Sequence, residues 1–166
     1  MHLTQHTDYA LRVLLYLAAH PDQPVDAPLI ASSFGISLHH VRKVVYELGR
    51  REYIVTSRGR AGGIRLLKAP SEISIGRVVR DMEPSLSLVE CFEASTNTCP
   101  IIGVCGLERL LRKANAVFLA ELDRHTLAQV MREPSALSAA LARHHAQQLT
   151  PLDAESASQG AAPGTA

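Results

Sequence analysis

Apolar side chains recur at helical spacing in the N-terminal part of the chain and predict three helices. The first is expected to begin near Thr7, which can act as its N-cap, and to end before Pro21. The second is expected to begin after Asp26 and to end at Gly35. The third begins after a cap at Ser37, and its expected inward positions are Leu38, Val41, Val45 and Leu48. Two short helices separated by a glycine turn, the second carrying basic residues, form a helix-turn-helix pattern.

The next part of the chain has the pattern of strands. Residues 53–57 and 64–67 are rich in β-branched and other apolar residues, and the sequence RGRAGG between them supplies the glycines of a turn. This predicts a β-hairpin directly after the helix-turn-helix, where a winged helix carries its wing. The expected fold class is therefore mainly α, with a winged helix-turn-helix DNA-binding region over residues 1–84.

A short helix, a loop and a tail are expected further along the chain. The short helix runs from a cap at Ser74 to Met82 and ends before Pro84. Residues 85–106 have no periodic pattern and are expected to form an irregular loop. Residues 135–166 are first Ala-rich and then small and polar, so they are expected to be a disordered tail with at most a frayed helix at its start.

A long amphipathic helix is expected between the loop and the tail. It runs from about Leu107 to Arg124. The apolar stripe of this long helix contains Leu107, Leu110, Leu111, Ala114, Val117, Phe118 and Leu122. A short helix is expected to follow it within the region 107–134. Such a stripe, outside a compact domain, favours pairing with a second copy of the chain. The simpler alternative is that the helix packs within its own subunit.

The charges of the chain are unevenly distributed. The formal net charge is only +1, so any nucleic-acid surface has to be local. Between residues 37 and 65 there are seven basic residues against two acidic ones. We expect the third helix to enter the major groove of duplex DNA with Ser37, His39, His40, Arg42 and Lys43. We expect the hairpin to reach the minor groove or its phosphates with Arg58, Gly59 and Arg60. For any single charge, an ordinary solvated surface position is the alternative.

Composition and motifs exclude several other classes of protein. Aromatic residues make up 4% of the chain and tryptophan is absent, which argues against a stacking platform for single strands. No apolar run approaches the length of a membrane span and the N-terminus lacks a signal-peptide pattern, so a cytoplasmic protein without a membrane partner is expected. No nucleophile elbow or zinc-peptidase motif is present, so no enzymatic activity is expected.

All three cysteines, Cys91, Cys99 and Cys105, lie in the expected loop. Core filling explains them poorly, because the segment has turn residues and few apolar neighbours. Thiolates gathered in this way suit an iron–sulfur cluster, while a zinc site and redox-active thiols without metal are the alternatives. Three thiolates leave one position of a cluster open, and no histidine lies between His40 and His125 to fill it. A fourth ligand from elsewhere, such as a carboxylate, would hold iron weakly, which suits a sensor better than an electron carrier.

Several segments of the chain resemble the Rrf-type winged-helix regulators, and within them the nitric-oxide-sensitive repressors. The matching pieces are MHLTQHTDYALRVLLYL at 1–17, RGRAGGIRL at 58–66, SIGRVVRDMEP at 74–84, CFEASTNTCPIIGVC at 91–105 and FLAELDRHTLAQ at 118–129. A sister group that regulates cluster assembly has a histidine three residues after the last cysteine, where this chain has Glu108. The resemblance therefore favours the nitric-oxide-sensitive branch.

The resemblance implies a homodimeric repressor with one iron–sulfur cluster per subunit, either 2Fe–2S or 4Fe–4S, on Cys91, Cys99 and Cys105. It implies that nitric oxide lifts repression, and two-fold symmetry implies a palindromic operator in double-stranded DNA. It also nominates Asp8 of the opposite subunit as the fourth ligand, whereas the sequence alone favours an ordinary first-turn acid at Asp8. An iron or redox sensor of the same family and a small iron–sulfur electron-transfer protein are the alternatives, and the basic helix and wing oppose the latter.

Overall fold

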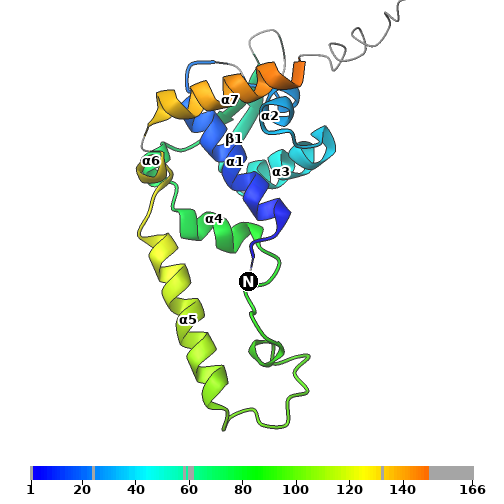
Figure 1. Ribbon diagram of the computed structural model, residues 1–166, viewed down its shortest axis with the longest axis vertical. Coiled ribbons are helices and arrows are strands. Elements are labelled where there is room, and N and C mark those ends of the chain that lie inside the picture. Colours follow the sequence, from blue (N-terminus) through cyan, green and yellow to red (C-terminus); the bar gives the residue numbers. More distant parts are fainter. Residues whose placement is uncertain (1, 24, 58, 60–61, 132, 150–166) are drawn as a thin grey trace, which may run out of the picture.

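The computed structural model describes residues 2–23, 25–57, 59, 62–131 and 133–149, and it shows the mainly helical winged-helix fold predicted from the sequence (Figure 1). The helices are α1 (Gln5–Ala19), α2 (Ala27–Phe34), α3 (Leu38–Arg50), α4 (Ile75–Met82), α5 (Gly106–Asp123), α6 (Leu127–Val130) and α7 (Pro134–Leu149). The strands are β1 (Ile54–Ser57) and β2 (Gly63–Leu66), and single 3-10 turns lie at Pro70–Glu72 and Glu90–Phe92.

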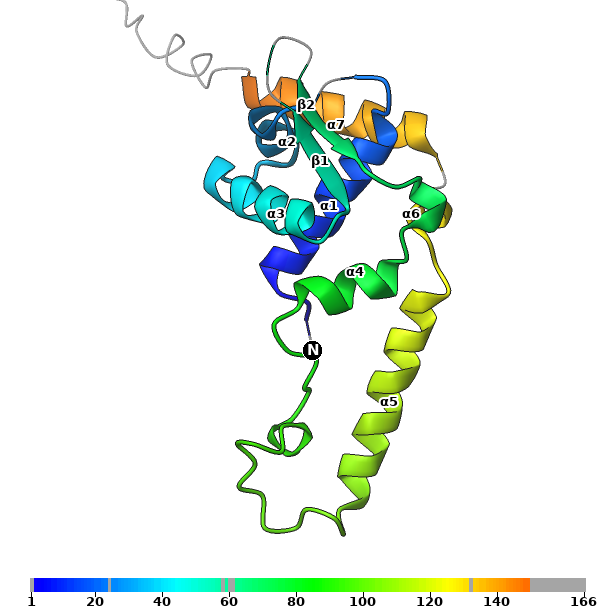
Figure 2. The ribbon, with the colours of Figure 1, turned by 180° about the vertical axis from the view of Figure 1, so that it is seen from behind.

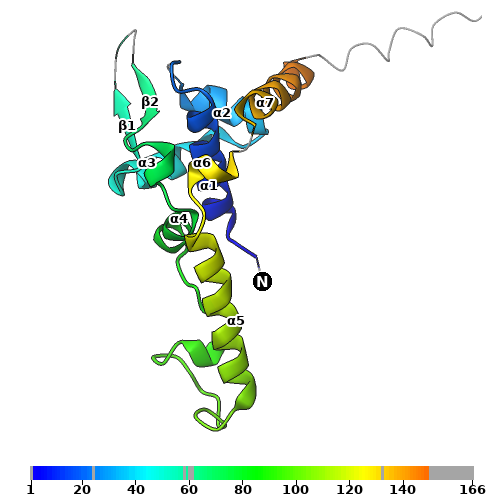
Figure 3. The ribbon, with the colours of Figure 1, turned by 90° about the vertical axis from the view of Figure 1, so that its left-hand side faces the viewer.

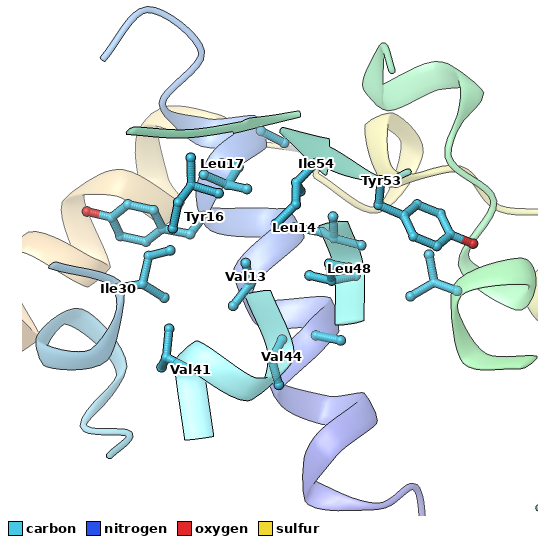
Figure 4. Close-up of a cluster of buried hydrophobic side chains, with 14 of the residues drawn as sticks. Val13, Leu14, Tyr16, Leu17, Ile30, Val41, Val44, Leu48, Tyr53 and Ile54 are labelled. Atoms are coloured by element: carbon cyan, nitrogen blue, oxygen red, sulfur yellow. The ribbon is translucent and has the colours of Figure 1, made fainter. Parts of the chain in front are cut away.

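The core of the winged-helix part is centred on α1. Val13 and Leu14 of α1 are fully buried, and Ile30 of α2 and Val41 and Leu48 of α3 pack around them (Figure 4). Burial of these apolar side chains is the main source of stability in such a small domain. Helix α1 packs against both α3 and α4, so it lies between the helix that carries the basic face and the helix that leads to residues 85–105.

Local capping signals set the ends of the first three helices, with one correction. Asp26 accepts a hydrogen bond from the Leu29 amide at 2.8 Å, and Ser37 caps α3, as predicted. Gly35 ends α2 with a left-handed φ of 63°, as a C-capping glycine does. The prediction of Thr7 as the cap of α1 was wrong, because Thr4 takes that role and its hydroxyl accepts from the Thr7 amide at 3.3 Å, while Thr7 itself is fully buried.

The predicted wing is a two-stranded antiparallel hairpin. Its register runs from Ile54 opposite Leu66 to Ser57 opposite Gly63. The amide of Ile64 donates to the carbonyl of Val25 at 2.7 Å, which fixes the hairpin to the segment before α2. Residues 58, 60 and 61 at its tip lie outside the described residues.

Helix α5 leaves the winged-helix part and projects away from it, with the 85–105 segment beside its far half (Figures 1 and 3). The joint between the two parts is made by α4 and by the chain around α6. The amide of Leu127 donates to the carbonyl of Ile73 at 2.8 Å, and the amide of Ile75 donates to the carbonyl of His125 at 2.9 Å. The C-terminal end of α5 is therefore fixed to α4, whereas the rest of α5 extends beyond the domain.

The expected disorder after residue 135 differs from the structure, because residues Pro134–Leu149 form helix α7. Leu141 is 7% exposed and Leu137 is packed against the core, so two leucines one turn apart supply apolar contacts that the Ala-rich composition concealed. Helix α7 packs against α2 and α1, on the side opposite the hairpin (Figure 3). The rest of the predicted tail, residues 150–166, lies outside the described residues.

Candidate nucleic-acid interface and metal centre

The predicted DNA-contacting residues of α3 all lie on its exposed face. Ser37, His39, His40, Arg42 and Lys43 are exposed, whereas the opposite face of α3 is fixed in the core by Val41, Val44 and Leu48. The His40 ring lies 5.9 Å from the ring of Tyr9 on α1. A helix that buries one face and exposes its N-terminal polar residues has the arrangement needed to enter the major groove.

The tip of the hairpin is described only at Gly59 and Gly62. Gly59 has a φ of 106°, a conformation that favours glycine, and nothing lies within 4 Å of the position a Cβ would take. Arg58 and Arg60 fall outside the described residues, so their contacts with DNA remain predictions.

The C-terminal turn of α3 is a small network of charges. Glu47 pairs with Arg50 at 3.4 Å and with Arg51 at 3.7 Å. One carboxylate thus pairs with two arginines, and Glu52 directly after them balances the second. The net positive charge of α3 and its C-terminal turn therefore comes from Arg42 and Lys43.

The three cysteines are free thiols, and each is half-buried. Three thiols on one irregular segment fit the soft donor set that an iron–sulfur cluster takes. Within the described residues of one chain, however, no group of three or more His, Cys, Asp or Glu side chains is close enough to hold a metal ion. The described part of the chain thus supplies the predicted thiols without a complete ligand set for a metal ion.

Residues 85–105 carry all three cysteines and are called the cysteine segment below. Hydrogen bonds within this segment connect the neighbours of its first two cysteines. The carboxylate of Glu90 accepts from both the amide and the hydroxyl of Thr98, each at 2.6 Å, and these bonds lower the pKa of Glu90. The amide of Cys99 donates to the side-chain oxygen of Asn97 at 3.0 Å. Because Glu90 precedes Cys91 and Thr98 precedes Cys99, the Glu90–Thr98 pair holds the backbone at these two cysteines side by side.

The cysteine segment is anchored on α5 by two side chains that the sequence did not single out. Arg112 donates to the carbonyl of Cys91 at 2.9 Å, its guanidinium lies 4.5 Å from the Phe92 ring centre, and it also pairs with Glu108. Asn115 donates to the carbonyl of Leu86 at 3.0 Å. These contacts join residues 21 and 29 positions apart, so no local pattern could have indicated them.

Asp8, the nominated fourth ligand, lies in the first turn of α1. Its carboxylate pairs with Arg12 one turn later, at 2.7 and 3.1 Å, and its side chain is 43% exposed. Within one chain Asp8 has the role of a first-turn acid, and its role as a ligand remains a prediction. The exposure leaves it accessible to a second molecule.

Helix α5 has no buried residue within one chain. Leu107, Leu110 and Val117 of its predicted apolar stripe are 61%, 62% and 61% exposed, and Val104 just before the helix is 80% exposed. Exposed apolar side chains on a projecting helix are typical of an interaction surface. Among the described residues, no helix is long and apolar enough to cross a membrane.

Comparison with known proteins places these features in a family. The profile described as "Rrf2: Iron-dependent Transcriptional regulator" matches residues 3–133. The chain is 50% identical over 142 residues to the HTH-type transcriptional regulator NsrR of Geobacillus kaustophilus, covering 85% of this chain and 97% of that protein. It is 47% identical over 133 residues to the NsrR of Bacillus subtilis, covering 80% and 91% of the two chains.

Solved structures show the same fold. The global cysteine regulator CymR of B. subtilis superposes with a TM-score of 0.65 at 23% identity, over 78% of this chain and 95% of that chain. T. potens IscR superposes with a TM-score of 0.64 at 22% identity, over 80% and 87% of the two chains. The predicted family resemblance is thereby confirmed, and so is the winged-helix fold.

Proposed function

Because the chain belongs to the Rrf2 family of transcriptional regulators, which are not enzymes, we propose that it is a repressor that senses nitric oxide through an iron–sulfur cluster. It binds a palindromic operator as a homodimer and leaves the operator when the cluster reacts with nitric oxide. The site of action is the cytoplasm, where the chromosome is accessible. The relatives named NsrR support this proposal over other members of the family.

One observation carries the proposal. The same chain presents an exposed basic recognition face on α3 and three free, half-buried thiols on one segment of the projecting part. DNA binding alone would not need the thiols, and an electron carrier would not need the basic face. Their combination favours a regulator whose DNA affinity depends on a bound group.

The residues that would hold the cluster are Cys91, Cys99 and Cys105, with Asp8 of a second chain as the fourth ligand. The donor set accommodates either 2Fe–2S or 4Fe–4S. When bound, the cluster supplies iron sites that nitric oxide can bind. Glu90 and Thr98 hold the segments that carry the first two thiols, and Arg112 fixes Cys91 to α5. A carboxylate is a harder ligand than a thiolate, so the Asp8 contact is the one expected to be weakest.

The dimer is proposed to form through the apolar face of α5. Its exposed leucines and valine would be buried against the same face of a second copy, as a two-fold interface requires. The two α3 helices would then face successive major grooves about one helical turn apart.

Contacts within one chain connect the start of the cysteine segment to the DNA-binding face. The amide and hydroxyl of Thr4, at the start of α1, donate to the carboxylate of Glu83 at 2.7 and 3.2 Å, just before the cysteine segment begins. Helix α1 in turn packs against α3. Loss of the Asp8 contact would free α1 to move with α3. A hundredfold drop in DNA affinity needs only ~2.7 kcal/mol of difference between the two arrangements.

The test is an absorption spectrum with iron and sulfide counts on protein purified without oxygen, before and after nitric oxide is added. We expect a coloured protein with stoichiometric iron and sulfide whose bands change on addition of nitric oxide. The matched variant Cys99→Ser should lose the colour and keep the fold. A colourless wild-type protein that contains zinc would contradict the proposal.

An iron or redox sensor is the second candidate, and the description of the family as iron-dependent favours it. The same spectrum separates the two functions. A cluster that is unchanged by nitric oxide and is lost on iron depletion would establish the second function.

A further inference from the structure

A groove of about 570 Å³ separates α3 from β1. Arg42, Tyr46 and Arg50 line one wall, and Val55 and Thr56 of β1 line the other. None of the eight residues lining the groove is acidic. The strand runs beside the C-terminal half of the helix, so the groove lies between the recognition helix and the wing (Figure 2).

The α3 wall of the groove has an exposed aromatic ring in a basic setting. Tyr46 is 65% exposed and lies one helical turn after Arg42 and one turn before Arg50. The guanidinium of Arg50 lies 5.9 Å from the centre of the Tyr46 ring. Val55 on the facing strand is 46% exposed and is paired across the hairpin with Arg65, which is also exposed. Both walls therefore present apolar surface next to a cation.

The turn between α3 and β1 builds the groove. Glu52 has a φ of 59°, and it is the one described residue other than glycine with a positive φ. Its amide donates to the carbonyl of Gly49 at 3.1 Å, and the amide of Tyr53 donates to the carbonyl of Leu48 at 3.0 Å. This tight reversal folds β1 back along the helix. A non-glycine residue in this conformation is strained, and such strain is typical of functional sites.

We propose that this groove binds the sugar–phosphate backbone of one DNA strand, with Arg50 on a phosphate and the Tyr46 ring against a deoxyribose. The inference rests on the proposed function and deepens it. If α3 enters a major groove and the hairpin tip reaches the adjacent minor groove, the backbone between those grooves has to pass between helix and hairpin. The α3–β1 groove lies at that position and is lined by Arg42 and Arg50. Arg50 would exchange its exposed 3.4 Å pair with Glu47 for a phosphate.

The two side chains have different effects on binding. Arg50 neutralises one phosphate, so its contribution falls with salt, whereas Tyr46 contributes packing that does not depend on salt. Neither contact reads a base, so both strengthen binding to any sequence. Sequence recognition is assigned to Lys43 and the other residues nearer the N-terminus of α3, which would contact base edges.

The experiment measures binding of the full-length protein, purified without oxygen, to two duplexes over a range of salt concentrations. One duplex is selected by the protein from a random-sequence pool, and the other is an unrelated duplex of equal length. The variants are Arg50→Ala and Tyr46→Ala. The matched control is Arg124→Ala, which removes an exposed arginine at the end of α5.

We expect Arg50→Ala to weaken binding to both duplexes by about three- to tenfold and to lower the salt slope by about one. Tyr46→Ala should weaken both with the slope unchanged, and Arg124→Ala should bind as the wild type does. The inference is overturned if both groove variants bind as tightly as the control, or if either loses affinity for the selected duplex alone. Wild-type protein that enriches no sequence from the random pool would overturn the proposed function itself.

Discussion

The guanidinium of Arg80 on α4 donates two hydrogen bonds to the carboxylate of Asp123 at the end of α5, at 2.5 and 2.6 Å. Next to this pair, a Cβ on Gly76 would lie 2.1 Å from the Asp123 carboxylate and 2.7 Å from its backbone nitrogen. The absence of a side chain at Gly76 thus allows α5 to approach α4 closely enough for the pair to form. The pair and the glycine together make the rigid joint between the DNA-binding part and the projecting helix.

Gly76→Ala should disrupt this joint, because backbone atoms of Asp123 have no room to move aside. We expect a loss of about 1–3 kcal/mol in the free energy of unfolding. Gly49→Ala is the matched control, since nothing lies within 4 Å of its Cβ position and alanine favours helix, and it should raise stability by about 0.5–1 kcal/mol. Denaturant unfolding measures both changes. Equal stabilities for the two variants would contradict the role of Gly76.

The Arg80–Asp123 pair should also make stability depend on pH in acid. The hydrogen bond from Arg80 lowers the pKa of Asp123 below its ordinary value of 3.8. The stabilisation is therefore fully present above that pH and is lost as the pH falls through the lowered pKa. Unfolding curves for wild type and Asp123→Asn should differ at neutral pH and converge below the lowered pKa. A difference that persists unchanged into strong acid would refute this assignment.

A second hydrogen bond, between Tyr53 before β1 and Asp81 on α4, should make the free energy of unfolding depend on pH in alkali. The Tyr53 hydroxyl donates to Asp81 at 2.6 Å, and burial, reinforced by this hydrogen bond, raises the pKa of Tyr53 above its ordinary value of 10.0. Its contribution is present below that pH and is lost as the pH rises through the raised pKa. Tyr53→Phe should lower the free energy of unfolding by about 1 kcal/mol at neutral pH. The stability of the Tyr53→Phe variant should also fall less steeply than that of wild type in strong alkali. Parallel pH profiles would contradict the contribution of the Tyr53–Asp81 hydrogen bond.

The exposed face of α5 makes a prediction about assembly. Leu110→Glu would place a charge at the centre of the proposed dimer interface, so the variant should sediment as a monomer. Ala116→Glu adds the same charge to another exposed face of α5, and this variant should remain dimeric. Wild-type protein that is monomeric at micromolar concentration would dismiss the interface altogether.

Asp8 makes a prediction about the cluster. Asp8→Ala should change the absorption spectrum of the anaerobic protein or the rate of its reaction with nitric oxide, because the weakest ligand would be lost. Asp22→Ala removes an exposed carboxylate from the turn after α1 and should change neither property. If both variants match the wild type, Asp8 is only the first-turn partner of Arg12 seen within one chain.

Local signals were sufficient to predict the winged helix from the sequence. Gly35 and Ser37 mark the turn of the helix-turn-helix, because a left-handed glycine and a capping hydroxyl act over a few residues. Thr4 and Thr7 are both possible caps, and tertiary burial of Thr7 decided between them. Helix α7 was expected to be at most a frayed helix for the same reason, since Leu137 and Leu141 gain their stabilisation from α1 and α2, not from the tail itself.

The site could be predicted only in part. The positions of Cys91, Cys99 and Cys105 are evident from composition, but the contacts that hold the segment, such as Arg112 to Cys91, join distant residues. Tyr46 could have been found, because it lies one turn after Arg42 and Lys43 on the exposed face of α3. Tyr46 carries no charge, so a search for basic residues does not select it. Asp8 was nominated as a ligand from a second chain by the family resemblance alone, because its position in the first turn of α1 is one where any helix favours an acid.

The most direct measurement of the central claim is the affinity of the anaerobic protein for its selected duplex, before and after nitric oxide. The account predicts tight binding that falls by about a hundredfold when nitric oxide is added, together with the change in the absorption spectrum. Cys99→Ser should not respond to nitric oxide at all. Affinity that stays constant while the spectrum changes would contradict the account, because the cluster would then react without controlling the DNA-binding face.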